Sequence, residues 1–264
     1  MGKFDGILLL SDIDGTLTYK EGHISEKNLE KIAYFKSEGG TFSIATGRDP
    51  GFLARHGLDK LLNAPAVILN GAAIYDYTAG KMFSRESITE DLSPVLDYIK
   101  ENCKGCRVSL SGSVKEVYYA PGVPDSDPFE ALYHAGACDK LAIASLDESF
   151  SIRLQQSMEK DFPQYDIHRG WSTGVEVISK KAGKGNGLLR LKKLLGNIHT
   201  TAAIGDFEND LSMLRAADVS ACPENAVPEL KACADMIVAS NTQNAVADFI
   251  DKLQLFIKGT KTQI

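Results

Sequence analysis

Short apolar runs recur along the chain, and each ends in a polar, turn-forming segment. The runs at residues 7–10, 41–45 and 201–204 are too short for helices and predict strands buried on both faces. Between such runs, apolar residues repeat at helical spacing. The first helical stripe, within residues 24–35, comprises Leu29, Ile32, Ala33 and Phe35. Strands alternating with helices predict a doubly wound α/β core with a parallel sheet.

The pattern changes character between residues 84 and 179. Helices are followed there by paired strands, with one helix expected over residues 127–135, and this order is typical of an α+β module. From Lys184 the strand–helix alternation resumes and continues to a terminal helix at residues 246–256. We therefore expect residues 1–83 and 180–264 to form the core, and residues 84–179 to form an inserted domain.

Composition and charge agree with a two-part globular protein. A chain of 264 residues exceeds the usual size of one domain, and 44% apolar with 24% charged residues is ordinary for a soluble protein. No apolar stretch is long enough to span a membrane, and residues 1–5 lack a signal-peptide pattern, so we expect a cytoplasmic protein without a membrane partner. A net charge of −6 without a basic run argues against a nucleic-acid partner.

The cysteines and histidines indicate no site of their own. The five cysteines include one C-x-x-C pair, Cys103 and Cys106, but no second pair of zinc ligands. The pair follows a helical pattern and precedes a strand, so we expect reduced structural thiols rather than a redox motif. The five histidines lie in unrelated segments and predict neither a metal site nor a catalytic triad.

Two carboxylates, Asp12 and Asp14, follow the first strand. Residues i and i+2 of an extended chain share a face, so both side chains can address one point, and Gly15 then allows a tight turn. Such a pair can hold a divalent cation while one carboxylate attacks and the other transfers protons. The alternative is an ordinary Asp-Gly turn in which Asp12 caps the next segment.

Further polar motifs stand at the ends of other strands or at a helix start. They comprise Thr46, Gly47 and Arg48 after residues 41–45, Lys184 at the start of a helical stripe, and Asp206, Asn209 and Asp210 after residues 201–204. A hydroxyl, a guanidinium and an ammonium beside free N–H groups suit a phosphate. Each motif taken alone is better explained by helix capping or by a solvated lysine, which are common. Because ligands of open α/β sheets bind outside the carboxyl ends of the strands, we expect the motifs to meet there.

Together these motifs resemble those of the haloacid dehalogenase superfamily phosphatases, in the Cof-type (C2-capped) sugar-phosphate phosphatase branch. The matching segments are Asp12-Ile13-Asp14-Gly15-Thr16, Ala45-Thr46-Gly47-Arg48, Leu69-Asn70-Gly71-Ala72-Ala73-Ile74-Tyr75-Asp76, Lys184-Gly185 and Gly205-Asp206-Phe207-Glu208-Asn209-Asp210. The resemblance implies a Rossmann-like core with an inserted α+β cap that covers the site and selects the substrate. It also implies a Mg²⁺-dependent phosphomonoesterase acting on a small phosphorylated metabolite, most often a sugar phosphate.

The resemblance also implies a role for each residue. Asp12 is the expected nucleophile and forms an aspartyl-phosphate, and Asp14 is the expected general acid and base. The remaining assignments are Thr46 and Lys184 on the phosphoryl group, Arg48 and Asn70 on the substrate or the cap, and Gly47 and Gly71 at points of close backbone approach. The expected Mg²⁺ ligands are Asp12, the backbone carbonyl of Asp14, and Asp206, supported by either Asn209 or Asp210.

Other functions stay open at this level. Related phosphotransferases and phosphosugar mutases carry a similar Asp-x-Asp-Gly-Thr motif but pass the phosphoryl group to a second substrate. A non-catalytic binding module is a third alternative, although the intact acidic and lysine positions argue against it. In the inserted domain, Trp171 and Arg169 lie between the last two expected strands, where they either read the leaving group or only cover the sheet.

Overall fold

The structure, a computed structural model, describes residues 2–112 and 116–261, with side chains up to residue 256. The chain divides into two compact units. One, the core unit, comprises Met1–Ser84 and Lys184–Ile264, and the other, the inserted unit, comprises Arg85–Gly183. The sequence pattern predicts these two borders after residues 83 and 179.

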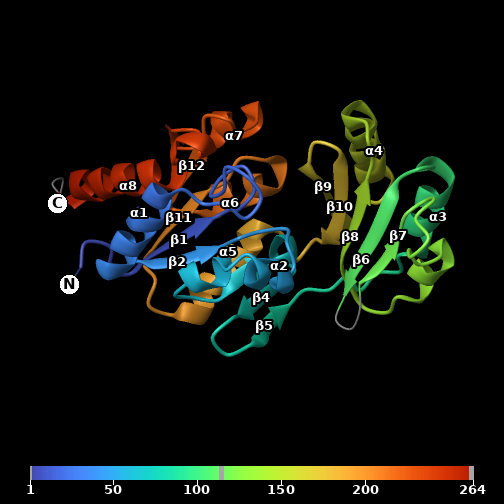
Figure 1. Ribbon diagram of the computed structural model, residues 1–264, viewed down its shortest axis with the longest axis horizontal. Helices are drawn as coiled ribbons and strands as arrows, with labels where there is room; N and C mark the ends of the chain where they lie inside the picture. The colour runs from blue at the N-terminus through green and yellow to red at the C-terminus, as the bar shows by residue number, and fades with distance from the viewer. Residues whose placement is uncertain (1, 113–115, 262–264) are drawn as a thin grey trace. The chain divides into compact units, whose positions relative to one another are not determined.

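A five-stranded parallel sheet with the order β13-β12-β11-β1-β2 forms the centre of the core unit (Figure 1). Its strands are β1 (Ile7–Ser11), β2 (Thr41–Ile44), β11 (Thr200–Ile204), β12 (Val219–Pro223) and β13 (Met236–Val238). The chain runs from β1 toward β2 on one side and returns to β11 on the other, so the strand order reverses between β1 and β11. Ligands of open α/β sheets bind at such a switch point.

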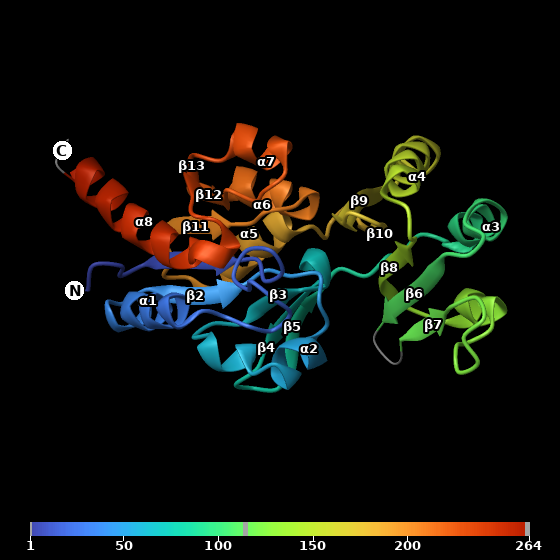
Figure 2. The same cartoon turned by 45° about the horizontal axis from the view of Figure 1, so that its top comes forward.

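Helices cover both faces of this sheet (Figure 2). On one face lie α1 (Glu26–Ser37) and α8 (Ala245–Lys261), and on the other lie α5 (Lys184–Leu195), α6 (Leu211–Ala216) and α7 (Pro228–Cys233). Leu8 and Leu10 of β1 pack with Leu188 of α5 and Met213 of α6 in one apolar cluster. Two covered faces explain why β1 is an unbroken apolar run rather than an alternating one.

The buried face of α1 differs in part from the predicted stripe. Ile32 and Phe35 are buried as predicted, but Leu29 and Ala33 are exposed, so the prediction is wrong for these two residues. Asn28 is buried in their place. Residues 28, 32 and 35 share one helix face at the usual spacing. The buried face of α1 is therefore shifted by one position, from residues 29 and 33 to residues 28 and 32.

Asn28 can be buried because both ends of its amide are hydrogen-bonded. Its Nδ2 donates to the carbonyl of Leu17 at 3.3 Å, and its Oδ1 accepts from the N–H of Ala247 at 2.9 Å. A buried amide with such partners is stable where an unpaired one costs about 1–3 kcal/mol. The contact joins α1 to the start of α8.

A small antiparallel sheet follows β2 in the core unit. It comprises β3 (Ala66–Ile68), β4 (Ala73–Asp76) and β5 (Lys81–Arg85), and the short helix α2 (Pro50–Arg55) precedes it. A parallel bridge between Ala45 and Val67 continues the main sheet from β2 to β3. The segment Leu69–Gly71, a 3-10 turn, is thereby carried to the carboxyl edge of the main sheet.

The inserted unit is an antiparallel sheet with the order β7-β6-β8-β10-β9 and helices on one face. Its elements are α3 (Ser93–Asn102), β6 (Arg107–Gly112), β7 (Val117–Tyr119), β8 (Cys138–Ala144), α4 (Glu148–Asp161), β9 (Tyr165–Trp171) and β10 (Gly174–Ser179). The α-helix expected over residues 127–135 is instead a 3-10 helix at Phe129–His134. It is confined between Pro128 and Gly136, whose φ is +76°, and so short a segment favours 3-10 geometry.

The parallel sheet of the core unit and the antiparallel sheet of the inserted unit confirm the predicted fold class, an α/β core with an additional α+β region. Cys103 and Cys106 are free thiols in the turn between α3 and β6, in agreement with the sequence. Within the described residues, no helix is both long and apolar enough to cross a membrane.

Candidate active site

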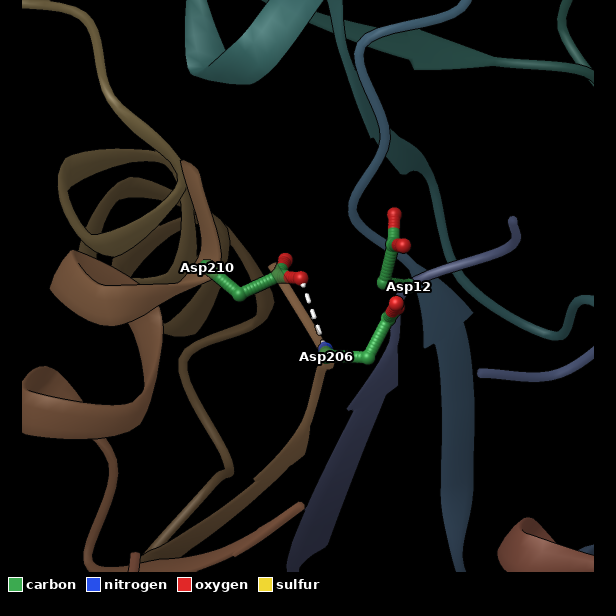
Figure 3. Close-up of side chains that lie close together, drawn as sticks. All are labelled: Asp12, Asp206 and Asp210. Carbon is green, nitrogen blue, oxygen red and sulfur yellow. Dashed lines mark hydrogen bonds between the residues drawn. The ribbon is translucent and has the colours of Figure 1, made fainter. Parts of the chain in front are cut away.

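The candidate site lies at the switch point of the core sheet. Asp12 directly follows β1, and Asp206 follows β11 by two residues, so the two side chains come from the strands that flank the switch point. Asp210 joins them, and one carboxylate oxygen of each lies within 4.8 Å of the others (Figure 3). The structure thus places Asp12 beside two carboxylates that lie about 200 residues later in the chain.

Lys184 connects two of these carboxylates. As the first residue of α5 it is completely buried, and its Nζ donates to Asp12 Oδ1 at 2.7 Å and to Asp210 Oδ1 at 2.6 Å. Burial favours the neutral amine, but the two carboxylates outweigh it and raise the pKa of Lys184. The ammonium therefore remains charged inside the protein.

The carboxylates themselves are electrostatically crowded. Burial, and next the neighbouring Asp210, raise the pKa of Asp12 well above its usual range. The same two causes raise the pKa of Asp206 to about 7. One ammonium does not compensate three carboxylates, and a further cation at this point would relieve their repulsion.

Asp210 also fixes the loop that carries Asp206. Its Oδ2 accepts hydrogen bonds from the backbone N–H groups of Asp206 at 3.0 Å and Phe207 at 3.2 Å, the first of which is dashed in Figure 3. With Oδ1 on Lys184, both oxygens of Asp210 hold parts of the protein. Asp210 therefore holds both Lys184 and the backbone of the loop that carries Asp206 in place.

The turn after β1 is held against the same loop. Thr16 Oγ1 donates to Asp206 Oδ1 at 2.6 Å. Gly15 has a φ of +80°, and a Cβ there would lie 2.3 Å from Asp206 Oδ2, so both the conformation and the contact require glycine. Asn225 Nδ2 donates to the Gly15 carbonyl at 2.8 Å. Neither Thr16 nor Asn225 is assigned a role by the sequence pattern, although Thr16 belongs to the acidic motif that includes Asp12 and Asp14.

Thr46, Gly47 and Asn70 lie beside each other on the other flank. Thr46 and Asn70 are buried, and a Cβ on Gly47 would lie 3.1 Å from Asn70 Oδ1. Asn209 Nδ2 donates to that same oxygen at 3.1 Å. Asn209 is therefore turned toward Asn70, and Asp210 lies with Asp12 and Asp206.

The backbone around Asn70 is left-handed for three residues. The φ values are 51° at Leu69, 52° at Asn70 and 83° at Gly71, a conformation that non-glycine residues adopt at some cost. The Asn70 N–H donates to the Thr46 carbonyl at 2.9 Å, and Arg190 Nη2 donates to the Gly71 carbonyl. These tertiary contacts hold a strained segment at the site.

Asp14 and Arg48 form an ion pair at the more exposed rim. Arg48 Nε donates to Asp14 Oδ2 at 2.9 Å, and its Nη2 donates to Asp14 Oδ1 at 3.1 Å. Both side chains are 42% exposed. The predicted residues of the core motifs thus meet at one edge of one sheet.

Arg169 and Trp171 belong to the inserted unit. Arg169 is buried and its Nη1 contacts Glu148 Oε1 and the Ser172 carbonyl, each at 3.3 Å, so it supports the hairpin between β9 and β10. Trp171 is 38% exposed.

A parallel sheet with helices on both faces and polar side chains gathered at its switch point is the architecture of the α/β enzymes, whose ligands bind at that place. The sequence model of the haloacid dehalogenase-like hydrolases matches residues 9–250, and the chain belongs to this family. The family inferred from the motifs is thus confirmed, and the chain is a hydrolase of this family.

Several relatives that match nearly the whole chain are named phosphatases. The chain is 30% identical over 280 aligned residues to the 5-amino-6-(5-phospho-D-ribitylamino)uracil phosphatase YwtE of Bacillus subtilis, with 92% of this chain and 96% of the relative covered. It is 27% identical to phosphoglycolate phosphatase 2 of Saccharolobus solfataricus, with 94% and 92% covered. Among solved structures, the subclass IIB sugar phosphatase BT4131 superposes with a TM-score of 0.80 at 21% identity, with 93% and 98% covered.

Proposed function

We propose that this protein is a Mg²⁺-dependent phosphomonoesterase that hydrolyses a small phosphorylated metabolite, with sugar phosphates as the preferred class, through an aspartyl-phosphate on Asp12. The observation that carries the proposal is the buried contact of Lys184 with both Asp12 and Asp210, beside Asp206, at the switch point of the sheet. The relatives' names support the substrate class, since they include a ribityl-phosphate and a sugar phosphatase.

The donor set fits Mg²⁺. Three carboxylates whose oxygens approach within 4.8 Å are hard oxygen ligands, and they carry more negative charge than Lys184 balances. Asp12, Asp206 and the backbone carbonyl of Asp14 would hold the ion, and Asp210 would support it through the loop. When bound, the ion would stabilise charge on the phosphoryl oxygens and reduce the repulsion between an anionic nucleophile and an anionic substrate.

Each side chain of the site then has its own role in the reaction. Lys184 holds Asp12 Oδ1 and so directs the carboxylate whose oxygen attacks phosphorus. The Thr46 hydroxyl accepts from the Arg48 N–H, which leaves its own proton to be donated to a phosphoryl oxygen. Asp14 gives a proton to the departing alkoxide and then takes one from the water that hydrolyses the aspartyl-phosphate.

The inserted unit would act as the cap that selects the leaving group, with residues 84–179 as its expected extent. The small metabolite is the only partner proposed, and a cytoplasmic location stays a prediction.

A trapping experiment tests these roles. Asp12→Asn should form no phosphoenzyme, whereas Asp14→Asn keeps the nucleophile but lacks the proton donor and base. With p-nitrophenyl phosphate, whose leaving group departs readily without a proton, Asp14→Asn should accumulate phosphate on Asp12. Mass spectrometry that locates stable phosphate on another residue would overturn the assignment.

The phosphotransferase or mutase alternative is tested by adding a sugar acceptor to the same assay. A phosphomonoesterase releases inorganic phosphate at a rate that the acceptor leaves unchanged. A transferase would instead convert the acceptor to its phosphate ester, which chromatography separates from the substrate.

A further inference from the structure

The pairing of Arg48 with Asp14 has the geometry of a clamp. Two N–H groups of one planar guanidinium meet the two oxygens of one carboxylate at 2.9 and 3.1 Å. A two-point contact between planar groups fixes both the plane and the direction of the carboxylate, which a single ammonium contact does not do. Since both side chains are 42% exposed, the pair adds little to stability, and its main effect is on orientation.

Arg48 is itself held in place. Its guanidinium carbon lies 4.3 Å from the centre of the Phe52 ring in α2, and Phe52 is buried. Its backbone N–H donates to Thr46 Oγ1 at 3.2 Å, and its carbonyl accepts from the Leu69 N–H at 3.2 Å. A side chain fixed at its backbone and along its planar face is a suitable support for another residue.

We infer that Arg48 is a positioning residue that acts on the reaction through Asp14, by aiming the carboxylate that exchanges protons with the leaving group and with water. The inference rests on the proposed function. It differs from the sequence expectation that Arg48 contacts the substrate or the cap, because the guanidinium N–H groups Nε and Nη2 are engaged by Asp14. Each carboxylate oxygen can accept a second hydrogen bond, so the clamp leaves Asp14 able to react.

The test compares two substrates of nearly the same shape that differ in the need for a proton. Phenyl phosphate releases a basic phenolate, whereas p-nitrophenyl phosphate releases a stabilised one. Because kcat/KM reports the steps up to departure of the leaving group, a misaimed proton donor lowers it mainly for phenyl phosphate. Arg48→Met should lower kcat/KM for phenyl phosphate by about 10- to 100-fold and for p-nitrophenyl phosphate by less than about 3-fold.

Three further variants complete the experiment. Arg48→Lys keeps the positive charge but loses the two-point contact with the carboxylate. Its kcat/KM for phenyl phosphate should stay about 10-fold below that of the wild type. In an Asp14→Asn background, Arg48→Met should add less than about 3-fold, because the residue it aims is already removed. The matched control is Arg55→Met, which removes an exposed arginine of α2 whose Nη2 lies 3.9 Å from Asp49 Oδ2. It should leave kcat/KM unchanged for both esters.

Retained kcat/KM on p-nitrophenyl phosphate shows that the Arg48 variants and the Arg55 control are folded, and formation of the phosphoenzyme from this ester shows the same for the two variants that carry Asp14→Asn. Equal losses on the two esters, full activity of Arg48→Lys, or independent losses from Arg48→Met and Asp14→Asn would each overturn the inference and leave the proposed function standing. A wild-type protein that hydrolyses neither ester nor any sugar phosphate would overturn both.

Discussion

Each unit of the molecule contains a group of charged side chains that are mostly buried, and the two groups differ in the balance of positive and negative charge. In the inserted unit, Glu176 Oε1 accepts from Lys140 Nζ at 2.5 Å, Glu176 Oε2 lies 3.7 Å from His168 Nε2, and His168 Nδ1 lies 3.1 Å from Asp166 Oδ1. With His168 protonated, these four side chains carry two charges of each sign. In the core unit, Asp12, Asp206 and Asp210 face the single ammonium of Lys184.

The pKa directions follow this difference. In the inserted unit, burial favours the neutral forms but is outweighed: Asp166 and Glu176 raise the pKa of His168 to about 9, and Lys140 and His168 lower the pKa of Glu176 to about 2. In the core unit, burial and like charge act together and raise the pKa of Asp12 and Asp206. In a balanced group the charges compensate one another within the protein. A group with surplus negative charge favours the binding of a cation.

The largest expected effect is that of metal removal on the unbalanced group. Dialysis against a chelator should lower kcat at least about 1000-fold, because several kcal/mol of charge stabilisation is lost, and Mg²⁺ should restore it. Mg²⁺ should also raise the unfolding temperature of the wild type but not of Asp206→Asn. Calcium should support turnover poorly, since its coordination is larger and looser. Full activity in excess chelator would contradict a cation site at these carboxylates.

Substitution of the lysine of each group, Lys184 or Lys140, should have opposite effects on turnover and on stability. Lys184→Met removes a charge proposed to contact the phosphoryl group, so kcat should fall by about 100- to 1000-fold. Lys140→Met leaves Glu176 buried without its closest cation, and the free energy of unfolding should fall by about 3 kcal/mol while kcat changes little. Urea unfolding and steady-state kinetics on both variants measure the contrast. A selective loss of sugar-phosphate turnover in Lys140→Met would instead assign the balanced group to substrate recognition.

The balanced group should also make stability depend on pH above neutrality. A histidine whose folded pKa is raised contributes stability that is complete below its unfolded pKa of 6.5 and is lost as pH rises through about 9. The groups that face it are Asp166, Glu176 and, across Glu176, Lys140. Between pH 7 and pH 10 the unfolding free energy should fall by about 2 kcal/mol more in the wild type than in His168→Gln.

The matched control for this measurement is His134→Gln, which replaces an exposed histidine of the same unit. It should follow the wild-type pH profile. A wild-type profile as flat as that of His168→Gln would show that the histidine is neutral in the folded protein and that the group is not balanced.

The smallest effect is expected at Trp171, in the hairpin between β9 and β10. If the inserted unit selects the leaving group, Trp171→Ala should raise KM for the best sugar phosphate by about 5-fold, equivalent to about 1 kcal/mol, and leave acetyl phosphate turnover unchanged. Equal losses for both substrates would indicate a role in folding or closure. Unchanged kinetics for both would remove Trp171 from substrate recognition.

The sequence by itself determined the strand–helix alternation, the change of pattern in the middle of the chain and the chemical character of each motif. These are local properties: an unbroken apolar run such as residues 7–10 specifies a doubly covered strand, and Asp12, Thr46, Lys184 and Asp206 each stand at a boundary that periodicity marks. The carboxyl ends of parallel strands meet at one edge, so the general place of the site could also be predicted.

Only the tertiary structure decided which side chains meet and which face is buried. Asp210 lies with Asp12 and Asp206 in the acidic cluster, whereas the side chain of Asn209 donates to Asn70, which is 139 positions away in sequence. Asn28 replaces Leu29 and Ala33 on the buried face of α1 because Leu17 and Ala247 satisfy its amide. Periodicity reports hydrophobicity along one segment, whereas burial of a polar group depends on hydrogen-bond partners that other segments supply.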